Sequence, residues 1–322
     1  MSQGPGRIDR GRIRTVPRAG ERRFSLAAQG RIPGPDTPFS QLLDCLPDVL
    51  MGRSVREVVA AVAAARAADR PVVALVGAHV VKTGCGPILV GLMERGLLTA
   101  VAMNGATAIH DYELACFGDT SEDVAEGLRS GTFGMWEETG AWMNRAAVLA
   151  HQRGEGLGEG LGRDLIERAA PNAGASILAT ASRLGIPATV HVALGTDIIH
   201  QHPAADGAAL GATSLADLDV LAQVLTRLEG GVAMNLGSAV VLPEVFLKAL
   251  TMARNVGGAT SGATFVNCDF QLHYRPRVNV LERPARECNG RAIALLGAHE
   301  ILLPLLAGWI VAAAGSRVPL GR

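Results

Sequence analysis

Five short apolar runs alternate with segments of helical pattern along this chain, and that alternation limits the possible folds more than any other feature. The runs lie within "PVVALVG", "LLTAVAMNG", "PATVHVALG", "GVAMNLG" and "ATFVNCDF". Continuous apolar runs bounded by Gly or Pro are typical of parallel strands buried on both faces. A helical pattern over 55–68 precedes the first run, and patterns over 87–96 and 243–257 separate later ones. The chain therefore predicts an α/β fold, a Rossmann-like doubly wound parallel sheet with helices on both faces.

Small or polar residues follow the apolar part of each predicted strand. They are Gly77, His79, Asn104, Gly105, Asp197, Gly237, Ser238, Asn267 and Asp269. Ligands of open α/β sheets bind in the crevice beyond the carboxyl ends of the strands, where helix N-termini also offer backbone N–H groups. Five segments would bring their polar residues to one edge of the sheet. The sequence therefore predicts an enzyme or a binder of small molecules.

The loop "GAHVVKTGCGP" contains the letters of a phosphate loop in the wrong order, because Lys82 precedes Thr83 and Gly84 without the required upstream glycine. This excludes a P-loop ATPase. A loop of small residues that opens a helix still suits a pyrophosphate or a ribose, so Thr83 is a candidate cofactor contact. The GxGxxG fingerprint of dinucleotide-binding folds is absent.

Composition narrows the class of protein further. The formal net charge is zero, which gives no electrostatic case for nucleic acid or for an acidic membrane as a partner. The five cysteines are scattered without a CxxC pair, as expected in a reducing compartment. No secretory signal is recognisable, and "ILLPLLAGWIVAAAG" is short and contains Pro304, so we predict a buried helix there. We expect a soluble, cytoplasmic protein.

Residues 1–36 are rich in Arg, Gly and Pro and poor in apolar residues. Such a segment cannot bury enough surface to fold alone. We predict a flexible arm that docks on a partner subunit, with nucleic-acid contact or targeting as alternatives. Residues 37–322 are predicted to form a single domain.

Two groups of residues are candidates for acid–base chemistry. In "MNGATAIHDYE", His110, Asp111 and Glu113 follow a strand, and a carboxylate beside a histidine suits general acid–base catalysis. The alternative is a helix-capping Asp beside a surface His. The second group is the stretch "TDIIHQHPAAD", where His200 and His202 stand one residue apart.

A histidine pair at this spacing binds metals when it lies on a strand, and His191 and Asp197 stand nearby. Pro203 and Gly207 instead suggest an irregular loop, and no further ligand has a recognisable spacing, so we assign no metal. His200 and His202, with Asp206, are expected to line the rim of a catalytic pocket, where histidine titrates near neutral pH.

The segment "FQLHYRPRVNVLERP" carries His273 and Tyr274 together with Arg275, Arg277 and Arg283. Arginine guanidinium groups bind carboxylates and phosphates through two parallel hydrogen bonds. The segment is therefore a candidate clamp for an anionic group, with His273 as a candidate catalytic residue. An arginine-rich loop at a subunit interface is an equal alternative.

Together these segments resemble the deoxyhypusine synthase family, in a bacterial-type form, over most of 72–312. The resemblance rests on "LVGAHVVKTGCGPILVGLMERGLLTAVAMNGA", "SILATASRLGIPATVHVALGTD", "GVAMNLGSAVVLPEV", "FVNCDFQ" and "EILLPLLAG". It implies a Rossmann-like NAD-binding fold and a homotetramer with active sites between subunits. It also implies hydride transfer from a polyamine carbon to NAD, followed by aminobutyl transfer to a lysine. By position, His79, Asn104, Gly105, Asp197, Ser238 and Asn267 are implied NAD contacts.

The chain departs from the family where the catalytic lysine belongs, because no lysine occurs between Arg283 and Leu296. Only Lys82 and Lys248 are lysines. We therefore expect a deoxyhypusine-synthase-like enzyme that uses NAD for transient oxidation of a small amine or alcohol. One such reaction is aminobutyl transfer between small amines, like that of a homospermidine synthase. The alternatives are a metal-dependent hydrolase built on His191, His200 and His202, and a non-catalytic nucleotide-binding homologue.

Overall fold

A computed structural model describes residues 7–17 and 25–315 of the chain. Within these residues six parallel strands form one sheet in the order β3-β2-β1-β4-β5-β6. Rossmann dinucleotide-binding sheets have this order, which reverses between β1 and β4. The strands are β1 (Val72–Val76), β2 (Ala100–Asn104), β3 (Ala188–His191), β4 (Val232–Leu236), β5 (Thr264–Asp269) and β6 (Arg291–Leu296). The predicted fold class is confirmed.

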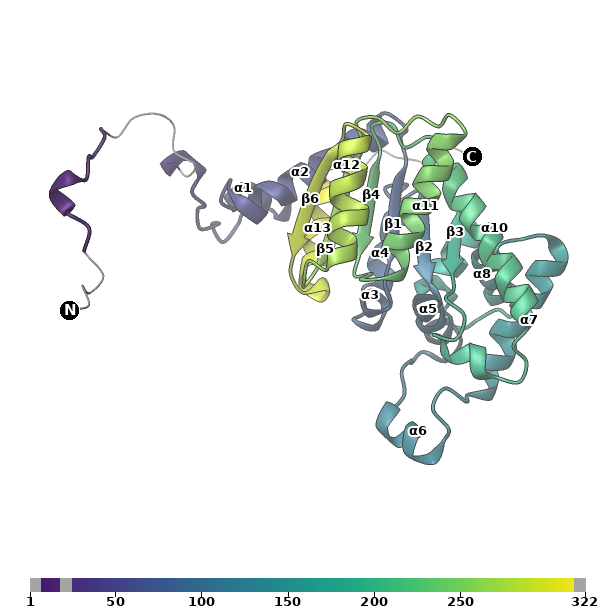
Figure 1. The fold of residues 1–322 in the computed structure, drawn as a ribbon. Helices are drawn as coiled ribbons and strands as arrows, with labels where there is room; N and C mark the ends of the chain where they lie inside the picture. Colours follow the sequence, from purple (N-terminus) through teal and green to yellow (C-terminus); the bar gives the residue numbers. More distant parts are fainter. Residues whose placement is uncertain (1–6, 18–24, 316–322) are drawn as a thin grey trace, which may run out of the picture.

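Successive residues of the strands face two separate layers of helices (Figure 1). Val72, Ala74 and Val76 of β1 belong to the larger core, whereas Val73 and Leu75 belong to the smaller one. The helices that cover the larger core include α2 (Leu50–Ala67), α4 (Gly86–Glu94), α8 (Leu157–Glu167), α9 (Ile177–Leu184) and α13 (His299–Ala314). The smaller core lies under α10 (Gly207–Leu225) and α11 (Val241–Asn255).

The glycine-rich stretch 153–162, which reads as a connection, contains the first half of α8. Its glycines allow close packing of backbones rather than flexibility. A Cβ on Gly158 would come within 2.1 Å of the carbonyl oxygen of Ala188 on β3, and one on Gly160 within 2.5 Å of Ala150 Cβ. A sequence pattern cannot separate these two uses of glycine without knowing what lies opposite.

The C-terminal part of the sheet also differs from the sequence expectation. The strand β6 was not predicted, because it lies at the edge of the sheet and half of its residues are exposed. The second half of the arginine-rich segment forms a π-helical segment, η5 (Pro276–Glu282), and the start of α12 (Arg283–Glu287), instead of a loop. Both elements pack beside β5 and β6.

The elements that follow β1, β2 and β3 shape the edge of the sheet at which the strands end, here called the carboxyl edge. They are α3 (Ala78–Lys82), α5 (Gly105–Phe117), α6 (Val124–Ser130), α7 (Glu137–Arg153) and η4 (Ile198–Gln201). Figure 1 shows α6 standing away from the rest of the molecule beyond this edge. On the β6 side of the molecule, α1 (Phe39–Cys45) packs on α13, with Phe39 stacked on Trp309 (Figure 1).

Among the described residues one helix, α10, is long and apolar enough to span a membrane by length and composition alone. In this fold it packs against β3, α7 and α11. Its Asp217 is buried and accepts hydrogen bonds from the backbone N–H groups of Gly158 and Val190. The predicted C-terminal helix is present as α13 and is shorter.

Candidate active site

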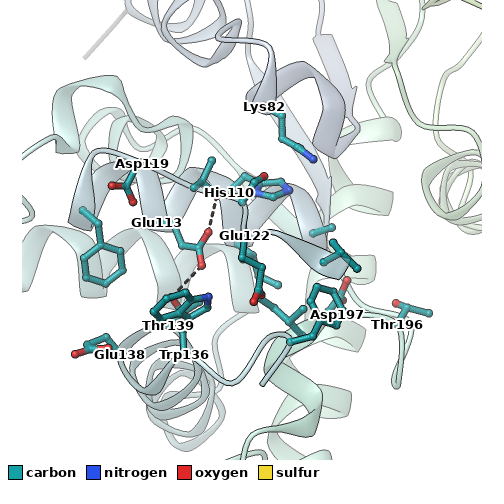
Figure 2. A pocket seen from close by; sticks show the side chains of 18 residues that line it. Lys82, His110, Glu113, Asp119, Glu122, Trp136, Glu138, Thr139, Thr196 and Asp197 are labelled. Carbon is teal, nitrogen blue, oxygen red and sulfur yellow. Dashed lines mark hydrogen bonds between the residues drawn. The ribbon is translucent and has the colours of Figure 1, made fainter. Parts of the chain in front are cut away.

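Two hollows lie at the carboxyl edge near the position where the strand order reverses. The carboxylate cavity, of about 560 Å³, lies beyond β2 and β3 and is lined by five acidic residues, which are Glu113, Asp119, Glu122, Glu138 and Asp197 (Figure 2). The histidine pocket, of about 490 Å³, lies beyond β1 and β4 to β6, where His79, His273 and His299 gather with Phe270. The carboxyl edge therefore offers two sites of different chemistry.

A chain of hydrogen bonds fixes His110 in the wall of the carboxylate cavity. The hydroxyl of Thr120 donates to Glu113 Oε2, so its oxygen is left to accept from His110 Nδ1, 2.7 Å away. Thr139 donates to the other carboxylate oxygen of Glu113 at 2.9 Å. Burial, together with the charge of Lys82, lowers the pKa of His110 to about 4. At neutral pH the ring is therefore uncharged, with its proton on Nδ1 and a lone pair on Nε2.

Asp197 lies at the start of η4, against the first turn of α5. A Cβ on Gly105 would come within 1.9 Å of Asp197 Oδ2, so only glycine leaves room for the carboxylate. Within the described part of the chain Oδ2 is buried without a hydrogen-bond partner. Burial raises the pKa of Asp197 to about 6. Asp197 is thus a desolvated carboxylate in the cavity wall, with one oxygen available to a donor.

His200 faces Asp197 but is not suited to act as a base. Its Nδ1 accepts hydrogen bonds from the backbone N–H groups of Gly195 and Asp197, at 3.1 and 3.2 Å. The neutral ring therefore carries its proton on Nε2, which lies 3.8 Å from Asp197 Oδ2. Burial lowers the pKa of His200. The ring presents an N–H donor towards the carboxylate and has no free lone pair.

Several residues of the cavity were missed by sequence reasoning because they are far apart in the chain. Lys82, at the end of α3, points towards His110 in Figure 2 and is the one Lys or Arg among the described lining residues. Phe133 and Trp136 form an aromatic wall from the segment between α6 and α7. The sequence carries no signal that this segment folds over the end of β2.

His110 and Asp111 are neighbours in sequence, but α5, which carries both, points their side chains in different directions. Asp111 is 2% exposed and accepts hydrogen bonds from Ser176 Oγ (2.6 Å), Ile177 N (2.8 Å) and Leu178 N (3.0 Å) at the start of α9. Consecutive helical residues point about 100° apart, so His110 faces the cavity and Asp111 faces α9. Asp111 does cap a helix, as the alternative interpretation proposed, but the capped helix is α9 and not α5, which carries Asp111.

The other residues of the histidine-rich stretch do not converge. His202 packs against Gly140 of α7, its Nδ1 accepts from Ala204 N at 3.1 Å, and neither it nor Asp206, which caps α10, lines the cavity. His191 is buried in β3 beside Thr189. No group of three His, Cys, Asp or Glu residues able to hold a metal ion occurs in the residues that the structure describes. The described residues therefore offer no set of metal ligands for the alternative of a metal-dependent hydrolase.

His299, another residue that the sequence did not single out, forms the floor of the histidine pocket. Its Nε2 lies 3.3 Å from the carbonyl oxygen of Cys268 and 3.9 Å from Asp269 Oδ1. Because a carbonyl only accepts, the bond places the proton on Nε2 and leaves the lone pair on Nδ1, which is buried without a partner among the described residues. Gly237, with φ +69°, lies against this ring, and a Cβ there would approach it within 2.9 Å.

Rings that follow β1 and β5 line the rest of the pocket. Phe270 lies 6.0 Å from His79, 6.3 Å from His299 and 6.5 Å from His273, measured between ring centroids. The pocket contains Asp269 and Glu300, and neither Lys nor Arg is among its described lining residues. It therefore suits a planar ring and a group that is neutral or cationic.

Most of the remaining residues that were predicted to contact the cofactor instead form hydrogen bonds or close contacts with backbone atoms. Asn104 caps α5 by accepting from Thr107 N at 2.9 Å, and Ser238 Oγ accepts from Leu242 N at 3.3 Å. Thr83 donates to the carbonyl of His79. Asn267 lies inside β5, fully buried, and accepts from Asn235 of β4 at 2.7 Å. Gly77 meets Gly237 so closely that a Cβ would lie 2.2 Å from the carbonyl oxygen of Gly237.

The arginines after β5 do not form a free anion clamp. Arg275 pairs with Glu244 at 3.3 Å, and Arg277 pairs with Glu282 at 2.6 Å. Arg283 donates to Asn279 Oδ1 at 2.8 Å. These partners occupy the guanidinium groups, and none of the three arginines lines either hollow.

Comparison with known proteins supports the fold of this chain and nothing more specific. No protein-family model and no curated protein matches the chain. Solved structures do match in fold. Unliganded AgrE superposes with a TM-score of 0.52 at 18% identity over 81% of this chain and 33% of that one. The ternary complex of AgrE with ornithine and NAD+ gives 0.51 at 17% identity over 81% and 34%.

A chain from Entamoeba histolytica named as a deoxyhypusine synthase gives a TM-score of 0.50 at 12% identity, covering 85% of this chain and 93% of that one. Identities this low show a shared Rossmann-like fold and no more. The present chain spans about a third of the length of AgrE.

Proposed function

We propose that this chain is a NAD-dependent enzyme that transiently oxidises a small amine or alcohol at the carboxyl edge of its sheet. The observation that carries the proposal is the pair of hollows at the carboxyl edge, one on the β2–β3 side of the point where the strand order reverses and one that extends from β1 across this point to β4, β5 and β6. In Rossmann sheets a dinucleotide lies across this crevice, with one half on each side. Two hollows at this position match that division.

The residues of the carboxylate cavity fit the adenosine half. Ribose hydroxyls are hydrogen-bond donors, and the buried Asp197 Oδ2 and the Nε2 lone pair of His110 are acceptors. The five carboxylates oppose a 2′-phosphate, which an arginine would otherwise bind. The cavity therefore favours NAD over NADP. Lys82, at the mouth nearest β1, supplies a positive charge for the phosphates.

The histidine pocket fits the reacting half. Phe270 and His79 offer ring faces on which a planar nicotinamide stacks, above the buried ring of His299. When bound, NAD would accept a hydride from a substrate carbon. We assign to His273 the proton that leaves the substrate N–H or O–H in the same oxidation, which converts the C–N or C–O single bond to an imine or a ketone.

The charges of the histidine pocket favour an amine over an acid. Asp269 and Glu300 line it, and neither Lys nor Arg does so among the described residues. A substrate carboxylate or phosphate would find no counter-charge, whereas an ammonium group finds two. A second small amine that adds to the imine carbon would complete aminobutyl transfer without an enzyme lysine, if the first amine leaves and the hydride returns from the reduced cofactor to the new imine. Ornithine with NAD+ in AgrE, and the deoxyhypusine synthase name of another structural neighbour, agree with amine chemistry on this fold.

The first test is mass spectrometry of small molecules released from freshly purified protein, with melting curves in NAD and NADP. We expect released NAD, or a melting shift with NAD that exceeds the shift with NADP. A panel of diamines, spermidine and alcohols is then incubated with the enzyme, and turnover is measured by mass spectrometry of the products, with absorbance of reduced NAD reporting the oxidation step. Absence of both nucleotide and melting shift would overturn the proposal. Binding without turnover across the panel would favour the non-catalytic homologue.

A further inference from the structure

The segment between α5 and α7 covers one side of the carboxylate cavity. We call residues 118–136 the α6 segment, because α6 lies at its centre. Both of its halves contribute to the cavity wall, with Glu122 before α6 and with Phe133 and Trp136 after it. A ligand that fills the cavity would therefore contact the α6 segment on both sides of its helix.

No buried side chain anchors the α6 segment to either hydrophobic core. Of its residues, all of which the structure describes, Gly127 and Gly134 are the two buried ones, and neither has a side chain. Val124, Leu128 and Trp136 are 48%, 67% and 55% exposed. In Figure 1 α6 stands away from the other helices. Because segments that bury few apolar side chains separate from a fold at low free energy, the α6 segment can move without disturbing the cores.

Glycines in the left-handed region stand at both ends of the α6 segment. Gly118 ends α5 with φ +84°, and Gly134 precedes α7 with φ +72°. Hinges of mobile segments are a few residues at the ends of helices and strands that absorb changes of φ and ψ. Ser121, between the two glycines, has φ +72°, which is strained for a residue with a side chain. The two glycines are therefore placed as hinges, and the strain at Ser121 lowers the free energy needed to leave the present conformation.

Thr120 is the side chain that ties the α6 segment to the cavity wall. Its hydroxyl donates to Glu113 Oε2 and accepts from His110 Nδ1, 2.7 Å away. Among the described residues, the other side-chain hydrogen bonds of the segment stay inside it. One further bond comes from outside, from Gln201 Nε2 to the carbonyl oxygen of Phe133 at 2.6 Å. Thr120 therefore holds the segment near its start, and Gln201 holds it near its end.

We propose that the α6 segment is a lid of the carboxylate cavity and that Thr120 is both its latch and the residue that positions His110. With the lid closed, the Thr120 oxygen accepts from the protonated Nδ1, so the Nε2 lone pair is left to the ligand. With the lid open, Nδ1 and the Glu113 carboxylate face water, and either ring nitrogen can carry the proton. Closing the lid therefore creates the acceptor that the ligand uses, and a ligand bound there favours the closed state. The response to NAD rests on the proposed function, whereas the latch is a property of the free protein.

Glu113 sets the direction of the hydrogen bonds in this latch. A carboxylate only accepts, so the Thr120 proton points towards it and the Thr120 oxygen is free to accept from His110. Thr139 of α7 donates to the other carboxylate oxygen at 2.9 Å and keeps Glu113 in place. The latch thus requires a hydroxyl group at position 120, and an apolar side chain of the same shape cannot replace it.

Histidine tautomers measured in the full chain test the positioning role. NMR of the imidazole nitrogens distinguishes a proton on Nδ1 from a proton on Nε2, and His110→Gln identifies the signals of His110. We expect a protonated Nδ1 in the unmodified protein and in Thr120→Ser, which keeps the hydroxyl. Thr120→Val, which has the same shape without the hydroxyl, should give a mixture of the two tautomers. An unchanged His110 signature in Thr120→Val would overturn the proposal.

Trypsin cleavage after Arg129, an exposed residue of α6, measures opening of the lid. When opening and closing are fast, the cleavage rate follows the population of the open form. We expect Thr120→Val to raise this rate several-fold and Thr120→Ser to change it little. Thr132→Val is the matched control, because the Thr132 hydroxyl bonds to Ser130 inside the lid. Equal cleavage rates in Thr120→Val and Thr132→Val would show that Thr120 is not a latch.

Saturating NAD separates this inference from the proposed function. Where calorimetric titration shows that NAD binds, we expect cleavage after Arg129 to slow several-fold in the unmodified protein and less in Thr120→Val. NAD that binds without slowing cleavage would contradict closure of the lid on its ligand. Failure of NAD to bind would overturn the proposed function, and the tautomer and cleavage results for the free protein would then support or overturn the latch.

Discussion

The carboxylate cavity and the histidine pocket stand at the same edge of one sheet and are built in opposite ways. The first has buried acceptors held by threonine hydroxyls and by a helix start, with an aromatic wall from a distant segment. The second has rings from three strand ends around Phe270. The cavity is suited to hold hydroxyl groups in fixed positions, and the pocket is suited to hold a planar ring.

The difference teaches that histidine has separate roles in the two regions. His110 in the wall of the carboxylate cavity and His200 beside Asp197 are fixed as single tautomers by their partners, and burial lowers the pKa of both. Neither is suited to take up a proton near neutral pH. In the histidine pocket His79 and His273 make ring contacts without such partners. The acid–base chemistry that the sequence placed around His110 and His200 therefore belongs, in our proposal, to the other region.

The largest effect is expected from Asp111→Ala, which removes the tie between the wall of the carboxylate cavity and α9. The change leaves Ser176 Oγ and two buried backbone N–H groups without their acceptor. We expect the free energy of unfolding to fall by about 3 kcal/mol or more. Chemical denaturation measures it, with Asp111→Asn as the control that keeps one acceptor oxygen. A loss below 1 kcal/mol would contradict this structural role.

The second effect tests which half of NAD lies in the carboxylate cavity. Asp197→Asn removes the charge that we assign to a ribose hydroxyl, so affinity should fall about tenfold to a hundredfold for NAD and equally for ADP-ribose. Calorimetric titration measures both, with Asp219→Asn on the exposed side of α10 as the matched control. If the variant instead lost affinity for putrescine and kept it for NAD, the two halves would be assigned in reverse.

The same carboxylate predicts a dependence on pH. A hydroxyl donor prefers the ionised form, so NAD affinity should fall as pH drops through about 6, by up to about tenfold per pH unit. In the free protein the sign is opposite. Because the folded pKa is raised, the stability contributed by Asp197 is present at pH below 3.8 and is lost as pH rises through about 6. Both trends should be absent in Asp197→Asn, and their persistence there would identify another group.

A smaller effect is expected from Phe270→Ala in the histidine pocket. Loss of a stacking ring should weaken NAD binding about threefold to tenfold, because an aromatic contact contributes about 0.5–1.5 kcal/mol. ADP-ribose, which lacks the nicotinamide, should be affected much less. Tyr274→Ala, at an exposed position outside the pocket, is the control. Equal losses for both ligands would remove the distinction between the two regions.

The smallest effect is expected from His202→Gln. The side chain lies against α7 and does not line the carboxylate cavity. NAD affinity should change less than twofold, measured by the same titration. A large loss would return His202 to the site that the sequence pattern suggested.

Local patterns were sufficient for most of the fold. The strands β1 to β5 coincide with the five apolar runs, and helices α4 and α11 begin and end close to their predicted positions. Burial on both faces makes such strands apolar throughout, so each strand can be recognised from its own residues without knowledge of its neighbours. β6 was missed for the converse reason, since an edge strand needs only one apolar face. α8 was missed because its glycines allow neighbouring backbone segments to pack closely against the helix, and the sequence does not show which segments lie there.

The sequence predicted that the candidate site lies at the carboxyl edge of the sheet, but not which role each residue has there. Polar residues after β1, β2, β3 and β5 do meet there, as parallel strands require. Their individual roles were decided by side-chain direction. Asp111 turned towards α9, Asn267 paired with Asn235 inside the sheet, and the arginines after β5 found partners within the chain.

By itself the sequence determined the class of sheet and the end at which its polar residues gather. Those properties depend on the alternation of apolar and polar residues along the chain, which is local. Only the tertiary structure decided that Thr120 orients His110, that Gly105 makes room for Asp197 and that His299 lies under Gly237. These contacts join residues whose separation in sequence carries no signal, because a hydrogen bond or a missing Cβ matters only once both partners are in place.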